Sequence, residues 1–476
     1  MPLILPGNVG SATAATGYNV ANSCRFNSGD SAVLKRTHGT PTNGKKFVWS
    51  AWIKRSKLGA DQYFVQNFTD SSNISMAYFR SGDDIRIFDR HGTGDGTDTV
   101  WISDAKFRDV SAWMHFLLKV DTTQGTDSNR LQVYINGSLA TGNTITYPAE
   151  NAVMNWTAAS ASNRHSIAAT SDGYNYVGGY LCEVVLIDGT APAHTDFGEV
   201  DSDSGIWKPI DVSGLTFGNN GYYLDFAETN LAATDQSIDT CTNNFATFNS
   251  LYRNSNSAIN YAEGNLSAIP AADGSISFSG STIAMPKTST SKWYAEFKTP
   301  VAEYGSLGIM DVDSISQAIN DNTDISSNSN GTSLGRVLFQ QGNGVVYYIG
   351  GTANTGLSTE NNNDIISIAW DAGAGKFYVA QNGTYGTISG TQQDPANGTA
   401  GVDVSGEAWY TASSAFVWYV GDNTTGASSQ FFGNFGSPHF AISSGNTDAN
   451  GYGNFEYAVP SGFYALCTKN LAEFGG

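Results

Sequence analysis

Short hydrophobic runs separated by turn residues make up most of this chain. The run 131–135 (Leu-Gln-Val-Tyr-Ile) alternates apolar and polar residues and leads into Asn136-Gly137, and the run 376–380 leads toward Asn382-Gly383. Asn-Gly favours the two-residue hairpin turn, because both central positions of that turn need a positive φ. No segment shows helical periodicity beyond about two turns. The pattern therefore predicts an all-β protein with very little helix.

A change of composition divides the 476 residues into parts. Residues 227–272 are mostly polar, but aromatic residues occur among them, so we expect a connector that packs against something. The blocks on either side, 23–226 and 273–476, each have about the length of one β-sandwich. Residues 1–22 are too rich in small residues to build a core and form an extended arm, either frayed or laid across a partner. We expect two antiparallel, jelly-roll-like β-sandwiches preceded by this arm.

Composition and charge remove several classes of protein. Aromatic residues make up 12% of the chain and charged residues only 14%, unlike disordered chains and coiled coils. The chain has 24 Lys and Arg against 43 Asp and Glu, a net charge of −19, and no basic stripe that would bind nucleic-acid phosphates. Anionic membrane surfaces would repel the chain for the same reason. We expect no nucleic-acid partner and no membrane insertion, since the longest apolar runs have only strand length.

Four cysteines are spread over the whole chain. They form no Cys-x-x-Cys pair, so their spacing excludes a zinc knuckle or a thioredoxin-type site. We expect thiols that pack as small hydrophobic side chains, and Cys182, inside the strand-like run 180–187, fits this best. A disulfide between Cys24 and Cys182 is the alternative. The four residues are Cys24, Cys182, Cys241 and Cys467.

The residue sets that could carry catalysis are incomplete. The six histidines include no His-Glu-x-x-His motif and no close pair that could hold a metal. We expect His115, between Trp113 and Phe116, to be a packed or hydrogen-bonded imidazole on a strand. The Gly-x-Ser-x-Gly match at 331–335 follows a polar run and precedes a strand-like one, so we interpret it as a turn and not as a nucleophile elbow. The sequence predicts no catalytic residue and no metal ligand.

Aromatic rings next to side-chain amides are suited to sugars, because rings contact C–H groups and amides bond to hydroxyls. Two loop segments, 172–176 and 407–410, combine aromatic with polar residues, and the first of them includes an amide. The candidate glycan contacts are therefore Tyr174, Asn175, Trp409 and Tyr410. The alternative is that the aromatic residues among them end strands and face the core.

Four runs in the first block form a set. They are the strand Phe47–Lys54, the run Trp113–Phe116, the hairpin Val133–Gly137 and the segment Tyr176–Val184. With these runs the block resembles a laminin-G-like module of the concanavalin A sandwich superfamily. The closing segment 195–226 and the motif 239–247 are similar to structural proteins of tailed bacteriophages, especially aquatic ones.

The second block carries a different set of runs. They are an early strand at 292–297, a central hairpin from 364–371 to 375–383, and a late strand at 432–436. With these runs the block resembles a SPRY (B30.2-like) sandwich. The tail 457–471 is again similar to the phage group.

The first resemblance raises two further chemistries. Laminin-G-like modules sometimes bind calcium through Asp oxygens, and none of the acidic pairs in this chain has the full calcium-loop spacing. We expect no cofactor, and a structural calcium ion stays an open alternative. Glycoside hydrolases of this superfamily carry Glu-x-Asp-x-x-Glu, whereas the nearest match, Glu199 and Asp201, ends at Ser204 and is incomplete. The acidic pairs are Asp83-Asp84, Asp201-x-Asp203 and Asp311-x-Asp313.

The resemblance implies a non-enzymatic surface protein of a phage virion: a tail fibre, tail appendage or capsid decoration that adheres to host cell-surface glycans or a receptor. Its other partners would be virion proteins and further copies of the chain, with a trimer favoured over a monomer or dimer that decorates a shell. It would be made in the host cytoplasm without a secretory leader, since Pro6 breaks a short apolar run that lacks basic residues. The alternative is a secreted carbohydrate-binding or carbohydrate-active protein, a lectin or a glycosidase.

Overall fold

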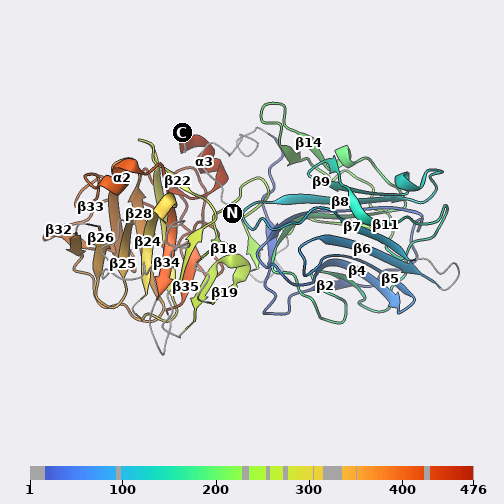
Figure 1. Cartoon of the computed structure of the whole chain (residues 1–476), viewed down its shortest axis with the longest axis horizontal. Helices are drawn as coiled ribbons and strands as arrows, with labels where there is room; N and C mark the ends of the chain where they lie inside the picture. Colours follow the sequence, from blue (N-terminus) through green and yellow to red (C-terminus); the bar gives the residue numbers. More distant parts are fainter. Residues whose placement is uncertain are drawn as a thin grey trace. The chain divides into compact units, whose positions relative to one another are not determined.

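The chain forms two compact units, an N-terminal unit of Ala15–Thr242 and a C-terminal unit that begins at Asn243. The structure is a computed structural model that describes residues 17–92, 98–227, 235–253, 258–271, 277–303, 305–314, 335–349, 351–422 and 429–474. Strands in largely antiparallel sheets are the main regular structure of both units, with very little helix (Figure 1). The predicted all-β fold class with two sandwiches is confirmed.

Two large sheets and one small ribbon build the N-terminal unit. The first sheet has the order β10 (Ser138–Leu139), β9 (Leu131–Ile135), β8 (Met114–Asp121), β3 (Lys46–Arg55), β13 (Gly179–Asp188), β1 (Ser23–Phe26) and β17 (Gln236–Ser237), with β16 (Tyr222–Leu224) also paired to β13. The second has the order β11 (Gly142–Thr146), β7 (Thr99–Ser103), β6 (Ile85–His91), β5 (Asn73–Phe79), β4 (Gln62–Asp70), β12 (His165–Ile167) and β2 (Leu34–Arg36). The ribbon pairs β14 (Gly198–Val200) with β15 (Trp207–Pro209), and the 3-10 turns η2 (Asp127–Asn129) and η3 (His194–Asp196) lie in loops.

The core of this unit lies between its two sheets. Trp49 of β3 packs against Phe64 of β4 with ring centroids 5.5 Å apart, and Phe116 of β8 packs against the same ring. All three side chains are fully buried. The sheets are thus joined by aromatic contacts, as in other face-to-face sandwiches.

The outer face of the first sheet is covered as well. Successive side chains alternate across a strand, so Val48 and Trp52 of β3 point away from the core that holds Trp49. Phe197 packs with Val48, and Trp207 packs with Trp52. The closing segment after β13 therefore buries the face that the core leaves open, which explains why β13 is buried along its whole length.

The C-terminal unit repeats the two-sheet plan. One sheet has the order β18 (Phe248–Arg253), β21 (Ser277–Ser281), β34 (Ala415–Asp422), β24 (Ser306–Asp311), β25 (Arg336–Gln340), β26 (Val345–Tyr348) and β27 (Gly351–Asn354), and β22 (Met285–Pro286) pairs with β34. The other has the order β19 (Ile259–Ala262), β20 (Ser267–Pro270), β35 (Phe431–Asn434), β23 (Lys292–Thr299), β28 (Asp364–Asp371), β29 (Lys376–Gln381) and β30 (Thr384–Tyr385). The strand β33 (Val402–Asp403) pairs with β29, β36 (Tyr464–Ala465) pairs in parallel with β23, and β31 (Thr387–Ile388) pairs with β32 (Thr391–Gln392).

The helices of this unit whose bounds are described are short. They include the turn η4 (Glu263–Asn265) and the helices α2 (Ala408–Ala412) and α3 (Thr468–Phe474). No helix among the described residues is long and apolar enough to cross a membrane. The core between the sheets includes Trp293, Trp370 and Trp418, each fully buried.

Both predicted hairpins are confirmed. Asn136 and Gly137 join β9 to β10 with φ of 47° and 75°. Asn382 and Gly383 join β29 to β30 with φ of 49° and 80°. These are the positive values that the Asn-Gly dipeptide accepts at little cost.

The segment 227–272, expected as a connector, is divided between the two units at Thr242. The strand β17 pairs with β1 and so extends the first sheet of the N-terminal unit. The strands β18, β19 and β20 belong to the sheets of the C-terminal unit. Of the expected arm 1–22, residues 1–16 lie outside the described residues, and Val20 is bonded to Thr242 within the N-terminal unit.

The disulfide considered between Cys24 and Cys182 does not form. Cys24 faces the core between the sheets, whereas Cys182 faces the covered outer side of the same sheet. Both are free, as are Cys241 and Cys467. Three of the four thiols are buried, as expected for small hydrophobic side chains, and Cys241 is half-buried.

Candidate ligand-binding site

A pocket of about 240 Å³ opens beside strand β3 of the N-terminal unit. Its floor comes from three neighbouring strands, with Ile53 on β3, Met114 on β8 and Ile135 on β9. Ile53 is the register partner of Met114, and Ile135 is the partner of Phe116. These side chains share the core-facing side of the sheet. The floor is therefore the open edge of the core.

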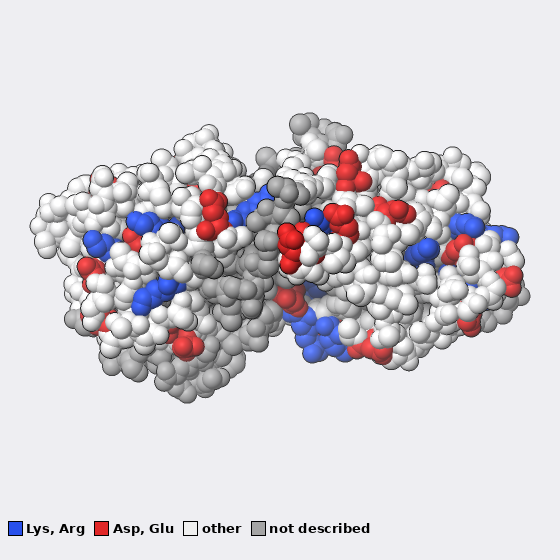
Figure 2. Space-filling view, turned by 90° about the horizontal axis from the view of Figure 1, so that it is seen from above, with Lys and Arg blue, Asp and Glu red and all other residues white. Residues whose placement is uncertain are grey.

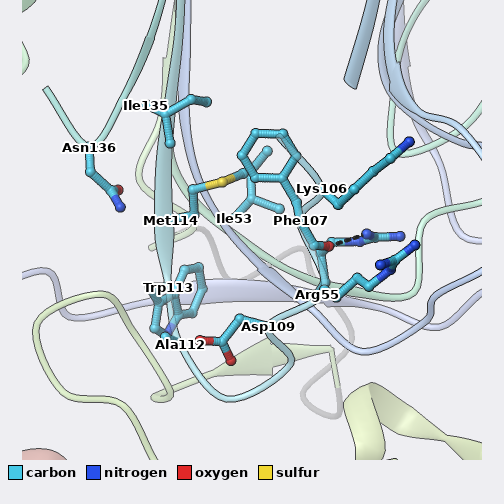
Figure 3. Close-up of a pocket in the computed structure, with 11 residues that line it drawn as sticks. Ile53, Arg55, Lys106, Phe107, Asp109, Ala112, Trp113, Met114, Ile135 and Asn136 are labelled. Atoms are coloured by element: carbon cyan, nitrogen blue, oxygen red, sulfur yellow. Dashed lines mark hydrogen bonds between the residues drawn. The ribbon is translucent and has the colours of Figure 1, made fainter. Parts of the chain in front are cut away.

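The wall of the pocket is the loop between β7 and β8. Figure 3 shows Phe107 of this loop lying close to Met114, with Lys106 and Arg55 on one side and Asn136 on the other. The full lining is Ile53, Arg55, Lys106, Phe107, Arg108, Asp109, Ala112, Trp113, Met114, Ile135 and Asn136.

Hydrogen bonds hold this loop at both ends. The Phe107 backbone N–H donates to the Asp83 carbonyl at 2.7 Å, and the Arg55 guanidinium donates to the Phe107 carbonyl. The Trp113 indole donates to Oδ1 of Asp239 at 3.1 Å. The aromatic rings of the wall are thus oriented before any ligand binds, which reduces the entropy that binding costs.

A network of ions borders the pocket. Asp83 accepts from Arg55 Nη2 at 3.2 Å and from Arg108 Nε at 3.0 Å. Burial raises the pKa of Asp83, but bonds from the Gly59 N–H, Arg108 and Arg55 outweigh it, so the pKa lies below the usual value. Burial lowers the pKa of Arg55 to about 10, so this guanidinium stays charged at neutral pH. Asp84 pairs with Lys106 in the same way.

Charges of both signs are mixed on one further face of the surface. On the face shown in Figure 2, Lys and Arg lie in small groups next to Asp and Glu, separated by uncharged surface. That view contains no continuous basic stripe of the kind that binds nucleic acid.

The predicted contacts Tyr174 and Asn175 lie outside this pocket, in a tight turn of the N-terminal unit. Tyr174 is 67% exposed, and its N–H and carbonyl both bond to Thr170. Asn175 has a φ of 56°, and its carbonyl accepts from the Tyr63 N–H at 3.0 Å. The Tyr174 ring is accessible to a ligand, and its role in glycan binding stays a prediction.

The predicted contacts Trp409 and Tyr410 lie in the C-terminal unit, on α2. The expectation for Tyr410 is corrected: its ring is 5% exposed and its hydroxyl donates to the carbonyls of Ala372 and Gly373. Trp409 is half-buried and packs edge-to-face on Phe416. The sequence suggested a loop, whereas the helical turn directs Tyr410 into the core.

His115 is buried on the covered outer face, within a hydrogen-bonded chain. Nδ1 accepts from the Trp207 indole at 3.0 Å, and Nε2 lies 2.8 Å from the Ser50 hydroxyl. Burial lowers the pKa of His115 to about 3, so the ring is neutral. Because indole N–H only donates, the imidazole proton sits on Nε2. Nε2 then donates to Ser50 and is not poised to remove its proton, as a general base would.

Glu183 is another polar group buried on this face. It has a φ of 52° at a bulge in β13, which directs its carboxyl toward two tyrosines. The Tyr223 hydroxyl lies 2.9 Å from both carboxyl oxygens, and the Tyr18 hydroxyl donates to one at 3.2 Å. Burial raises the pKa of Glu183 to about 7 even though both tyrosines lower it.

The acidic pairs considered for calcium have protein partners. The Asp201 carboxyl accepts from Ser204 and pairs with Lys208 at 3.2 Å, and Asp83 and Asp84 belong to the network described above. Asp311 accepts from the Ser314 N–H at 2.9 Å. Among the described residues, no group of three or more His, Cys, Asp or Glu side chains could hold a metal ion. Of the 331–335 motif, only Gly335 is among the described residues.

Sequence reasoning missed the pocket. Its floor and wall come from residues up to 83 positions apart, from Ile53 to Asn136, so no local motif contains them. One signal was present: Lys106-Phe107-Arg108 places an aromatic residue between two cations in a chain of net charge −19.

Comparison with known proteins finds a family match for part of the N-terminal unit. Residues 27–194 match a laminin G model described as the concanavalin A-like lectin/glucanases superfamily. Every residue that lines the pocket lies inside this range. No curated protein sequence matches the chain.

Solved structures are similar to parts of the chain. A Bacteroides ovatus protein provisionally named as carbohydrate-binding is 13% identical, over 45% of this chain and 54% of that one, with a TM-score of 0.31. This chain thus spans about half the length of that protein. The SPRY domain of human HERC1 is 10% identical over 39% of this chain and 96% of its own, with a TM-score of 0.27. The enzymatically active domain of tailspike protein 2 of bacteriophage CBA120 is 16% identical over 46% of this chain and 31% of its own, with a TM-score of 0.31. Residues 27–194 of the N-terminal unit are thus similar to the concanavalin A-like lectin/glucanases superfamily.

Proposed function

We propose that this chain is a non-enzymatic glycan-binding protein and that the pocket beside β3 is its sugar site. The observation that carries the proposal is an oriented aromatic and apolar lining with polar groups at its mouth, inside a lectin-like module. Sugar rings present C–H faces that pack on such side chains, and their hydroxyls bond to charged and amide groups.

Asn136 supplies such an amide. Its Oδ1 accepts from the His115 backbone N–H at 2.8 Å, which fixes the side chain. Asn136 is exposed, and it lies across the pocket from Lys106 in Figure 3. A ring on the floor would thus have polar groups on both sides.

The proposed setting is the surface of a tailed-bacteriophage virion, as a fibre, tail appendage or capsid decoration. Support comes from the sequence resemblance of the segments 195–226 and 457–471 to structural proteins of such phages. Several copies, most simply a trimer, would engage repeated surface sugars together, because linked sites raise the effective concentration. Residues 1–22 would contact another copy or another virion protein.

Binding is tested on an array of bacterial surface glycans with the full chain, Trp113→Ala and Tyr174→Ala. We expect Trp113→Ala to lose about tenfold or more in affinity, roughly the contribution of one aromatic contact. Tyr174→Ala should bind as the parent does if the pocket is the site. Loss with Tyr174→Ala alone would move the site to the 172–176 turn, and no binding by the parent would refute the proposal.

The virion setting is tested by electron microscopy of purified particles with an antibody to this chain. Gold label on tails or capsids is expected, and unlabelled particles would favour the secreted lectin or glycosidase instead. Light scattering of the full chain at micromolar concentration, with and without residues 1–22, tests self-assembly. A monomeric full chain would leave the segment only a role in docking to another protein.

A further inference from the structure

We propose that the pocket prefers carboxylated sugars, such as uronic or sialic acids, over neutral ones; this rests on the proposed glycan binding. The network beside the pocket contains four cations, Arg55, Arg80, Lys106 and Arg108, which share only two carboxylates. Asp109 also lines the pocket. Even with it included, the border keeps an excess of positive charge.

The cations nearest the mouth are available to a ligand. The side chains of Lys106 and Arg108 are 43% and 60% exposed, although both are paired. Arg108 uses Nε for Asp83, so its two Nη nitrogens have no hydrogen-bond partner among the described residues. A guanidinium held in this way offers a planar pair of donors, which matches the geometry of a carboxylate.

Asp109 does not cancel this preference. Its Oδ1 accepts from both the N–H and the hydroxyl of Ser111, at 2.7 and 2.6 Å. These bonds hold the carboxylate toward its own loop. In Figure 3 it lies below Phe107, whereas Lys106 extends to the right of that residue.

The size of the pocket points to one sugar ring. Drug-sized ligands occupy pockets of roughly 300–1,000 Å³, and this pocket has about 240 Å³. One ring would rest on Phe107 and Met114, with its carboxylate at Arg108 and a hydroxyl at Asn136. A charged group is needed for affinity in such a small site, because little apolar surface is buried.

The test compares galacturonate oligosaccharides with their methyl esters, which keep the ring and remove the charge. Binding to the full chain is measured by calorimetry at low and high salt, and sialyllactose and lactose form a second pair. We expect the acid to bind at least about tenfold more tightly than the ester, with the difference shrinking as salt rises.

Variants locate the effect. Arg108→Gln and Lys106→Gln should each reduce acid binding and leave ester binding within about twofold. The matched control is Arg90→Gln, which also removes one positive charge. Arg90 on β6 forms an exposed ion pair with Asp98, just before β7, and neither residue lines the pocket. Equal affinity for acid and ester, or binding to neither while other glycans on the array bind, overturns this inference alone. A parent chain that binds no glycan on the array overturns both.

A second inference concerns Cys182 and Cys241, and it does not depend on glycans. We infer that these two thiols form a disulfide when the protein meets an oxidising medium. Cys182 belongs to the cluster around Trp52 and Trp207, and Cys241 packs against the same cluster. Each thiol perturbs the pKa of the other. Cys24 and Cys467 lie in other clusters.

The chemistry needs a small-molecule disulfide such as oxidised glutathione. The half-buried Cys241 thiolate attacks it and releases one reduced glutathione, and the Cys182 thiolate then displaces the second from Cys241. Two protons leave the thiols, and the two electrons reduce the glutathione disulfide. Burial raises the pKa of both thiols, so the reaction should be faster at alkaline pH. The bond would tie the end of the N-terminal unit to β13.

The full chain is treated with oxidised glutathione at alkaline pH, then digested and examined by mass spectrometry. A bridged peptide containing Cys182 and Cys241 is expected, with two thiols remaining of four. Cys182→Ala should abolish the bridge, whereas Cys24→Ala, the buried control, should retain it. Four thiols that remain free after denaturation, or glutathione left on Cys241 without a bridge, would overturn the inference.

Discussion

The Trp207 indole fixes the tautomer of His115. Its N–H donates to Nδ1 at 3.0 Å, so the imidazole proton is placed on Nε2 and points at Ser50. A serine beside a histidine would suggest a nucleophile and its base. Here the histidine is the donor, and the closing segment that carries Trp207 buries the whole chain of hydrogen bonds.

Removing that indole N–H should reduce stability. Trp207→Phe leaves Nδ1 of His115 buried without a donor, and we expect it to lower the free energy of unfolding by about 1–3 kcal/mol more than Trp409→Phe. Trp409 is the matched control, because its Nε1 has no hydrogen-bond partner among the described residues. Denaturant unfolding of both variants measures the difference. Equal losses would show that packing alone explains the role of Trp207.

Local patterns in the sequence predicted local structure well. The Asn-Gly turns at 136–137 and 382–383 depend on the conformations of two adjacent residues, and both hairpins form. The burial of Tyr410 was not predictable in this way. Its hydroxyl bonds to carbonyls at 372 and 373, and no short pattern shows that these distant residues meet.

The pocket escaped prediction for the same reason. Its floor depends on the register that sets Ile53 opposite Met114, two residues that lie 61 positions apart in the sequence. The polar composition of 227–272 suggested a connector, yet Ser237 pairs with Ser23 and completes a sheet edge. Long-range strand pairing, which composition does not encode, decides both features.

Glu183 should make stability depend on pH. Its pKa is about 7 in the folded chain and 4.5 for an ordinary glutamate, so between these values the folded state binds the extra proton. The stabilisation of the folded state by this proton is fully present below about pH 4.5 and is lost as the pH rises through 7. Glu183→Gln removes this titration. Between pH 5 and about 8.5 we expect the free energy of unfolding of the variant to rise, relative to that of the parent, by up to about 3 kcal/mol.

Thermal melts across this pH range check the prediction. Glu199→Gln is the control, because Glu199 is an exposed carboxylate on β14 that pairs with Lys208. A difference between parent and Glu183→Gln that stays constant with pH would contradict the assignment.

The boundary at Thr242 should decide which fragment folds. Lys54 and Asp239 form a buried ion pair at 2.7 Å, with both side chains 1% exposed. A fragment of 23–226 lacks Asp239 and leaves the buried Lys54 ammonium without its carboxylate, which lowers the free energy of unfolding by about 3–5 kcal/mol. We expect the fragment 17–242 to unfold cooperatively. The free energy of unfolding of the fragment 23–226 should be lower by about that amount.

Within the full chain, Asp239→Asn should lower the free energy of unfolding by the same amount. Asp98→Asn, which breaks the exposed pair with Arg90, is expected to cost only about 0–1 kcal/mol. Denaturant unfolding compares the two. Equal stability of the two fragments would indicate that Lys54 finds other partners.

Gly137 links the hairpin to the closing segment. It has a φ of 75°, and a Cβ placed there would lie 2.3 Å from the Trp207 ring. Gly398 has a similar φ of 69° with no atom within 4 Å of its Cβ position. Gly398→Ala should therefore cost only the strain of a left-handed alanine, about 1–2 kcal/mol. Gly137→Ala adds a collision with the buried Trp207 ring. We expect it to lower the free energy of unfolding by about 1–3 kcal/mol more than Gly398→Ala does.

The second effect of Gly137→Ala concerns the pocket. Trp207 must move to admit the methyl group, and His115, which both receives its hydrogen bond and holds Asn136, moves with it. Asn136 is the amide on one side of the pocket. We therefore expect Gly137→Ala to weaken glycan binding as well as stability, whereas Gly398→Ala leaves binding unchanged. Binding that survives Gly137→Ala intact in a folded sample would show that the Asn136 amide does not contact the sugar.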